Sequence, residues 1–295
     1  MLELNKIYHG DCFELIEQIP DKSVDMILED MPYGTTACKW DQGKISEDQK
    51  LFLKWFDDIP FNITFQDESY LFYWEMFCDL FNKLFRQPID LAEYWKSRKR
   101  IIKDNGVIVL TASQPFTSLL VMSNLKMFKY FWYWNKKIPS CMLRAKYRPL
   151  NQIEDICVFS IDGKKTRYNP QKIKRDKIIK SGGNVASKEL HNNFLKKEYR
   201  KTYQYKEPIT LITFDKIRRN LLNPTQKPVP LFGYLIKTYT NEGDLVVDGF
   251  AGSGTTGEAC LRTKRNFICI EKDLEMFQKA EKRIKIEQSK LTFQF

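Results

Sequence analysis

A glycine-rich stretch near the end of the chain, DLVVDGFAGSGTTGEACL (residues 244–261), has the residue types of a ligand-binding turn. An apolar, strand-like run ends at Asp248, and four glycines then lead into a helix-like segment, so backbone N–H groups can approach the anionic end of a ligand. The first and third glycines have phosphate-loop spacing, but Thr255 and Thr256 stand where such a loop needs Lys and then Ser or Thr. The turn therefore argues against a nucleotide-hydrolysing enzyme.

The next strand-like run, NFICI, ends at Glu271. An acid at the tip of a neighbouring parallel strand is placed to accept hydrogen bonds from ribose hydroxyls. Taken alone, Glu271 would be a solvated acid at the start of a helix. Together with the glycine turn, it predicts a site for a ligand that contains adenosine.

A third acid, Asp30, closes the apolar run SVDMILED and is followed at once by Met31, Pro32, Tyr33 and a glycine. A strand that stops at an acid and turns through Pro and Gly leaves that carboxylate and the tyrosine ring at the carboxyl edge of a sheet. This is the edge at which open α/β sheets bind ligands.

Strand-like and helix-like runs alternate along the chain and would position these acids. The pattern predicts an α/β fold with a doubly wound, mostly parallel sheet. Residues 51–91, crowded with Phe, Tyr and Trp, interrupt the rhythm and are expected to form a helical insertion. The insertion would be core under a lobe, or alternatively a dimer contact or a lid.

Composition limits the class of protein further. A chain of 295 residues that is 43% hydrophobic can bury one large core, and it has neither a signal-peptide layout nor a long apolar run, so we expect a soluble intracellular protein. Seven cysteines without C-x-x-C spacing argue against a disulfide framework and against a structural zinc site. We expect reduced, mostly buried thiols and no metal.

The positive charge of the chain is concentrated in one segment. Residues 163–220 hold 17 Lys or Arg against 5 Asp or Glu, whereas the rest of the chain holds 31 against 32. Tyr168, Tyr199, Tyr203 and Tyr205 are interleaved with these cations, a combination suited to a polyanion, with cations on phosphates and rings on bases or sugars. The alternative is a solvated, partly disordered basic loop.

Two motifs resemble a known family. The stretch from Asn223 to Thr256 resembles the joined cofactor motifs of amino-group DNA methyltransferases, and EDMPYG resembles their catalytic D-P-P-Y motif. The catalytic motif comes first, then a variable recognition region, then Q-K-P and the glycine turn, which is the permuted order of the beta group. The resemblance extends over about residues 4–50 and 92–285.

The resemblance implies a Rossmann-like methyltransferase fold with an inserted recognition lobe. Residues 1–161 and 221–295 would form one catalytic and cofactor-binding domain, and residues 162–220 would form the basic target-recognition region.

The implied cofactor is S-adenosylmethionine. Its methionine part would lie at the glycine turn, its carboxylate near Gln226 and Lys227, its ribose at Glu271 and its adenine near Asp11. The full set of implied cofactor-binding residues is Asp11, Gln226, Lys227, Asp248, Phe250, Gly252, Gly254, Thr255, Thr256 and Glu271.

The implied catalytic residues are Asp30, Met31, Pro32 and Tyr33. Asp30 and the Met31 carbonyl would hold the two hydrogens of an exocyclic amine and aim its lone pair at the sulfonium methyl, so no covalent nucleophile is needed. Tyr33 would stack on a base extruded from the duplex. Met31 departs from the Pro usual in the family, but Pro32 still favours an extended backbone at position 31.

A second aromatic run, FKYFWYWNKK, is similar to the family's later strand, in which an aromatic side chain packs against the flipped base. By position Trp134 is the candidate, with a place in the core as the alternative. Lys136 and Lys137 are expected to contact phosphate.

An acid at position 30 is typical of family members that methylate adenine, whereas Ser is commoner in those that methylate the cytosine amine, which stays an alternative. Methylation at carbon 5 of cytosine is disfavoured, because no Pro precedes a Cys. An inactive DNA-binding protein of the same fold, or methylation of RNA or a small molecule, are further alternatives. The expected partners are double-stranded DNA, a second copy of the chain and a cognate restriction enzyme, in the cytoplasm of a bacterium or in a phage-infected cell, with no membrane.

Overall fold

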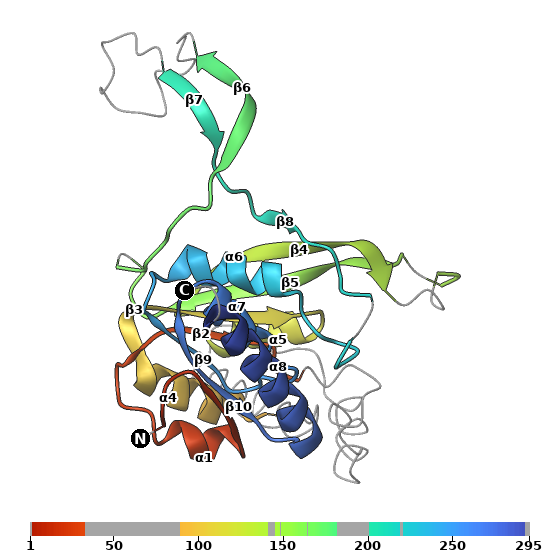
Figure 1. Cartoon of the computed structure of the whole chain (residues 1–295). Helices are drawn as coiled ribbons and strands as arrows, with labels where there is room; N and C mark the ends of the chain where they lie inside the picture. Colours follow the sequence, from red (N-terminus) through yellow and green to blue (C-terminus); the bar gives the residue numbers. More distant parts are fainter. Residues whose placement is uncertain are drawn as a thin grey trace, which may run out of the picture.

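The computed structural model describes residues 2–32, 89–140, 145–147, 149–163, 165–181, 201–218 and 221–292. These residues form an α/β body with a twisted central sheet and a long hairpin that projects from it (Figure 1). The predicted helical insertion at residues 51–91 lies outside the described residues, apart from its last three. No helix in the described part of the chain is long and apolar enough to cross a membrane.

The described part of the central sheet has eight strands in the order β1-β10-β9-β2-β3-β5-β4-β8. Neighbours from β1 to β3 pair in parallel, β5 is antiparallel to both β3 and β4, and β8 is parallel to β4. The predicted doubly wound, mostly parallel sheet is therefore confirmed. The strands are β1 (Lys6–His9), β2 (Val24–Glu29), β3 (Ile102–Ala112), β4 (Phe128–Ser140), β5 (Asn151–Ser160), β8 (Leu211–Thr213), β9 (Leu245–Asp248) and β10 (Asn266–Glu271).

Helices cover both faces of the sheet, because the central strands are apolar on both sides. In β2 every residue is buried; Met26 and Leu28 pack on one face and Ile27 on the other. The first face is covered by α6 (Val229–Tyr239), α7 (Thr255–Arg262) and α8 (Leu274–Thr292). The second is covered by α1 (Cys12–Ile16), α4 (Leu91–Ile101) and α5 (Phe116–Ser123). The four cysteines in the described residues are buried and free, as expected.

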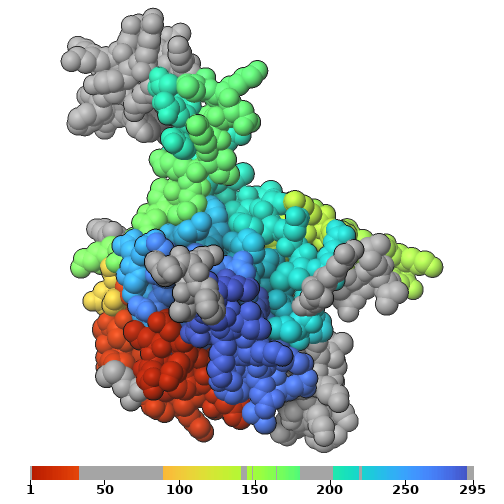
Figure 2. Space-filling model, viewed as in Figure 1, coloured from red at the N-terminus to blue at the C-terminus, as the bar shows by residue number. Residues whose placement is uncertain are grey.

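The basic segment contributes to two different structures. Strands β6 (Ile173–Ser181) and β7 (Lys201–Lys206) pair as an antiparallel hairpin that stands away from the body (Figures 1 and 2). By contrast, β8 hydrogen-bonds to β4 and extends the central sheet. The part of the segment that projects is therefore the hairpin.

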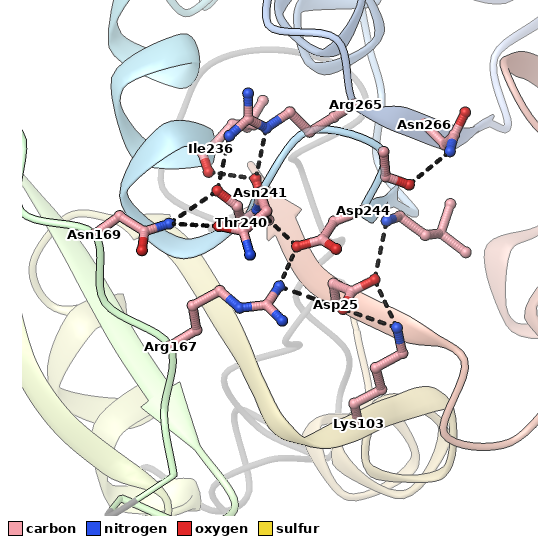
Figure 3. A network of polar contacts seen from close by, with 12 residues as sticks. Asp25, Lys103, Arg167, Asn169, Ile236, Thr240, Asn241, Asp244, Arg265 and Asn266 are labelled. Carbon is pink, nitrogen blue, oxygen red and sulfur yellow. Dashed lines mark hydrogen bonds and ion pairs between the residues drawn. The ribbon is translucent and has the colours of Figure 1, made fainter.

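The chain that leads into the hairpin is tied to the sheet by a polar network (Figure 3). The Arg167 guanidinium contacts the carboxylates of Asp244 and Asp25, which lie at the amino ends of β9 and β2. The Asn169 side chain donates to the carbonyl of Thr240, just beyond α6, at 3.1 Å. These contacts hold the base of the hairpin at the edge of the sheet opposite the carboxyl ends of the parallel strands.

Candidate active site

Three acids meet at the carboxyl edge of the sheet because the strands that end in them are parallel neighbours. Glu271 ends β10, Asp248 ends β9 and Asp30 follows β2. All three line one cleft of about 830 Å³, a volume in the range of small-ligand sites. Predicted site residues that also line it are Asp11, Pro32, Gln226, Lys227, Phe250, Gly252, Thr255 and Thr256.

The glycine turn takes the conformation that its sequence suggests. Gly252 and Gly254 have φ of 50° and 75°, a region that residues with a Cβ avoid, and Gly254 directly precedes α7. The Gly252 N–H donates to a carboxylate oxygen of Glu271 at 2.6 Å. Burial raises the pKa of Glu271 above its ordinary value. The turn and the acid of the next strand are thus one unit at the floor of the cleft.

Asp248 stabilises the turn from within. Its carboxylate accepts hydrogen bonds from the Phe250 N–H, at 2.9 Å, and from the Thr256 hydroxyl. The residue is buried, and burial raises the pKa of the carboxyl well above its ordinary value. Asp248 therefore fixes the local path of the backbone that a ligand would meet.

A buried ion pair beneath the turn was not found from the sequence. Glu29, the last residue of β2, accepts from the Gly249 N–H at 2.9 Å, from Arg98 Nη2 at 2.9 Å and from the Tyr94 hydroxyl at 2.6 Å. The side chains of Glu29 and Arg98 have no exposed surface. A Cβ at Gly249 would lie 2.5 Å from Arg98 Nη2, which explains the glycine there. Two features of the sequence could have indicated this pair. One is a charged residue at the end of an apolar strand, and the other is the spacing of Tyr94 and Arg98, four positions apart on one helix.

Asp30 lies at the mouth of the cleft within a second charged cluster. Both oxygens of its carboxylate are 2.8 Å from the Lys227 ammonium, and the Thr111 hydroxyl donates to one of them. Lys227 also lies 2.8 Å from Oε1 of Glu154, a residue of β5 that the sequence did not single out. Burial alone would lower the pKa of Lys227, but the two carboxylates raise it above its ordinary value. Lys227 is therefore a fixed ammonium ion.

The rest of the predicted catalytic motif is described only in part. Met31 is buried against the core, and Pro32 lines the cleft. Tyr33 lies outside the described residues.

Two further predicted cofactor residues that line the cleft, Asp11 and Gln226, make local contacts. Asp11 accepts from the Phe13 N–H at the start of α1 and from Lys272 Nζ at 2.8 Å. Gln226 accepts from the Leu222 N–H at 3.1 Å through its side-chain oxygen. These contacts hold both side chains at the wall of the cleft.

A residue of α8, Arg283, also holds the glycine turn in place. Arg283 pairs with Glu258 of α7 and donates to the carbonyl of Ser253 at 2.9 Å and to the hydroxyl of Thr255 at 3.2 Å. The sequence did not single out this arginine. In the folded chain it joins α8 to the glycine turn.

The three residues predicted to bind substrate lie along β4 in different surroundings. Trp134 is 2% exposed, belongs to the core and donates to the Phe214 carbonyl at 2.9 Å, as its core alternative expects. Lys136 is buried, with its ammonium 3.7 Å from Glu154. Lys137 is more than half exposed and pairs with Asp215 at 2.8 Å. Only Lys137 presents a cation on the surface.

Comparison with known proteins identifies the family. A family model for N6/N4 DNA methylases matches residues 24–282. Among curated relatives, the type II methyltransferase M2.MboI of Moraxella bovis is 26% identical over 94% of this chain and 86% of its own length. The type II methyltransferase M.HinfI of Haemophilus influenzae is 28% identical over 96% and 68%, respectively.

Solved structures show the same fold. The M1.HpyAVI–SAM complex superposes with a TM-score of 0.53 at 23% identity, over 95% of this chain and 98% of that one. The PvuII cytosine-N4-specific DNA methyltransferase superposes with a TM-score of 0.57 at 17% identity, over 97% and 92%. The family match includes Asp30, the glycine turn and Glu271, and the chain belongs to the N6/N4 DNA methylase family.

Proposed function

We propose that this protein transfers a methyl group from S-adenosylmethionine to the exocyclic amine of adenine in double-stranded DNA. The observation that carries the proposal is that Asp30, the glycine turn and Glu271 line a single cleft. The relatives named type II methyltransferases support the reaction class and the expectation of a cognate restriction enzyme.

The cleft has the groups that such a cofactor needs. Glu271 is a carboxylate at the end of β10, where it can accept hydrogen bonds from ribose hydroxyls. The turn from Gly252 to Thr256 presents backbone N–H groups at the start of α7, which suit a carboxylate. Asp11 and Phe250 line the same cleft and would face the adenosine part. Gln226 and Lys227 would lie toward the methionine part.

When bound, S-adenosylmethionine supplies a methyl group activated by its positively charged sulfur. Asp30 would accept one hydrogen bond from the adenine amine, and the Met31 carbonyl would accept the other. These two acceptors hold the nitrogen with its lone pair directed at the methyl carbon, and orientation of this kind supplies much of the rate in a direct displacement. As the carbon–nitrogen bond formed, the carbon–sulfur bond would break with its electron pair returning to sulfur as a neutral thioether, and the methylated nitrogen would release its extra proton to water. Tyr33 would stack on the flipped base.

The basic hairpin supports DNA as the substrate. Lys174 and Lys177 of β6 are exposed, and Tyr203 and Tyr205 of β7 are 44% and 49% exposed. Cations on phosphates and exposed rings on bases or sugars are the contacts that nucleic acid uses. We assign target recognition to residues 162–220, with the hairpin as its projecting part, and catalysis to the remainder. Lys137 would add a phosphate contact from β4.

The acid at position 30 favours adenine. The cytosine amine stays the second candidate, because the same pair of acceptors can hold it and the PvuII enzyme, named as cytosine-N4-specific, shares the fold. An inactive DNA-binding protein is disfavoured by the presence of Asp30, the glycine turn and Glu271 in one cleft.

The test is mass spectrometry of nucleosides from mixed-sequence duplex DNA after incubation with the protein and methyl-labelled S-adenosylmethionine. Label in methyladenosine is expected from the wild type, whereas Asp30→Ala should lose it and still bind the cofactor. The matched control is Asp104→Ala, an exposed acid near the start of β3. Label in the cytosine amine would keep the mechanism and change the base. Label equal in Asp30→Ala and the wild type would remove Asp30 from the mechanism.

A further inference from the structure

Asp30 is the outermost member of a group of four charged side chains that reaches from the cleft into the sheet. The Lys227 ammonium touches Asp30 and Glu154, and the Lys136 ammonium lies 3.7 Å from the other oxygen of Glu154. The four residues come from the end of β2, the loop before α6, β5 and β4. The negative charges of the two carboxylates equal the positive charges of the two ammonium ions.

Exposure differs along the group. The Asp30 side chain is 23% exposed, whereas those of Glu154, Lys136 and Lys227 are 12%, 8% and 7% exposed. Charges this buried are held in place by their partners, because water is not available to replace a lost contact. Lys227 is fixed between two carboxylates, and Glu154 is the deeper one.

Glu154 also determines how strongly the Lys227 ammonium attracts the Asp30 carboxylate. A carboxylate can accept about four hydrogen bonds, so Asp30 can hold Lys227, Thr111 and an incoming amine together. Its strength as an acceptor for the amine depends on how much of the ammonium charge it must balance. Because Glu154 shares that charge, Asp30 keeps more of its own negative charge for the base.

We infer that Glu154 is a positioning residue for methyl transfer, which acts through Lys227 to orient Asp30 and to maintain its strength as an acceptor. This inference rests on the proposed function. Glu154 does not touch the reacting atoms; Asp30 does.

Two variants of Glu154 should separate its charge from its shape. Among the described residues, charged groups around Asp30 are Lys227 before α6, Glu154 on β5, Lys136 on β4 and Asp248 at the end of β9. Glu154→Gln keeps the shape but removes the charge that shares Lys227, so it should slow methyl transfer. Glu154→Asp keeps the carboxylate and should recover part of the lost rate.

The experiment is single-turnover methylation of duplex DNA by each variant, with a cofactor-binding titration of each. We expect Glu154→Gln to lower the rate by about 10²-fold, the effect of a small misplacement of a reacting group, with cofactor affinity within about twofold of the wild type. The matched control is Asp155→Asn: its side chain accepts from the Thr117 hydroxyl of α5, at 2.7 Å, on the other face of the sheet. This control should keep the wild-type rate.

Three results would count against the inference. Equal rates in Glu154→Gln and Asp155→Asn would overturn it and leave the proposed function intact. A Glu154→Asp variant as slow as Glu154→Gln would show a structural role only, and would also overturn it. If the wild type transfers no label to DNA while binding the cofactor, the proposed function fails, and the inference fails with it.

Discussion

The contributions of Glu29 and Arg98 to the free energy of unfolding should be strongly coupled, because the two side chains form a buried ion pair. A double-mutant cycle measures this coupling. Neither side chain has exposed surface, and Glu29 also accepts hydrogen bonds from the Gly249 N–H and the Tyr94 hydroxyl. Glu29→Gln keeps the shape and an acceptor for Gly249 but leaves the Arg98 guanidinium without its counter-ion. Arg98→Met leaves the Glu29 carboxylate buried and unpaired. The double variant removes both charges and keeps an apolar side chain against the neighbouring rings of Phe13 and Phe250.

The magnitude follows from burial. Removal of one partner of a fully buried pair costs about 3–5 kcal/mol of unfolding free energy, whereas replacement of both by side chains of similar volume costs far less. We therefore expect each single variant to lose about 3 kcal/mol or more and the double variant to lose less than their sum by at least about 2 kcal/mol. With a urea m-value of about 3 kcal/mol/M, each single change would lower the midpoint by about 1 M.

The assay is urea unfolding followed by tryptophan fluorescence, with a parallel titration of S-adenosylmethionine. Because Glu29 and Arg98 both pack directly against Gly249 of the glycine turn, movement of either side chain in the single variants should also weaken cofactor binding. The surface pair of Lys22 and Asp104, with side chains 48% and 68% exposed, serves as the control cycle and should show far weaker coupling, because water screens an exposed ion pair. The reasoning is refuted if the unfolding free energy lost by the double variant equals the sum of the two single losses to within about 0.5 kcal/mol.

Two further predictions concern the glycine turn and the hairpin. Gly254→Ala should weaken cofactor binding and destabilise the protein more than Gly243→Ala. Both glycines have positive φ. A Cβ at Gly254 would lie 3.0 Å from the Ala280 side chain, whereas a Cβ at Gly243 would meet nothing within 4 Å. Thermal unfolding of the two variants checks this, and equal losses would show that backbone strain alone matters there. The double variant Lys174→Gln/Lys177→Gln should reduce the slope of log K for DNA against log salt by up to about 2, with unchanged cofactor affinity. Filter binding at several salt concentrations measures the slope, and an unchanged slope would place the phosphate contacts elsewhere.

The sequence by itself determined the parts of this protein that depend on neighbouring residues. The apolar run before Asp30 and the proline after it, and the run before Asp248 with its glycines, specify strands that end in turns through local backbone preferences. Alternation of strands and helices then implied a parallel sheet, and a parallel sheet brings the carboxyl ends of its strands to one edge. The cleft could be predicted from these local features.

Tertiary structure alone decided which side chains meet beneath and beside that cleft. Lys227 reaches Asp30 across 197 positions of sequence, and Arg98 reaches Glu29 across 69. Strands that are buried on both faces lose the alternation of polar and apolar residues that would show which face each side chain takes. Glu154, in the half-buried part of β5, carried no signal in the sequence, because its importance comes from the order of β5, β4 and the loop before α6 in space.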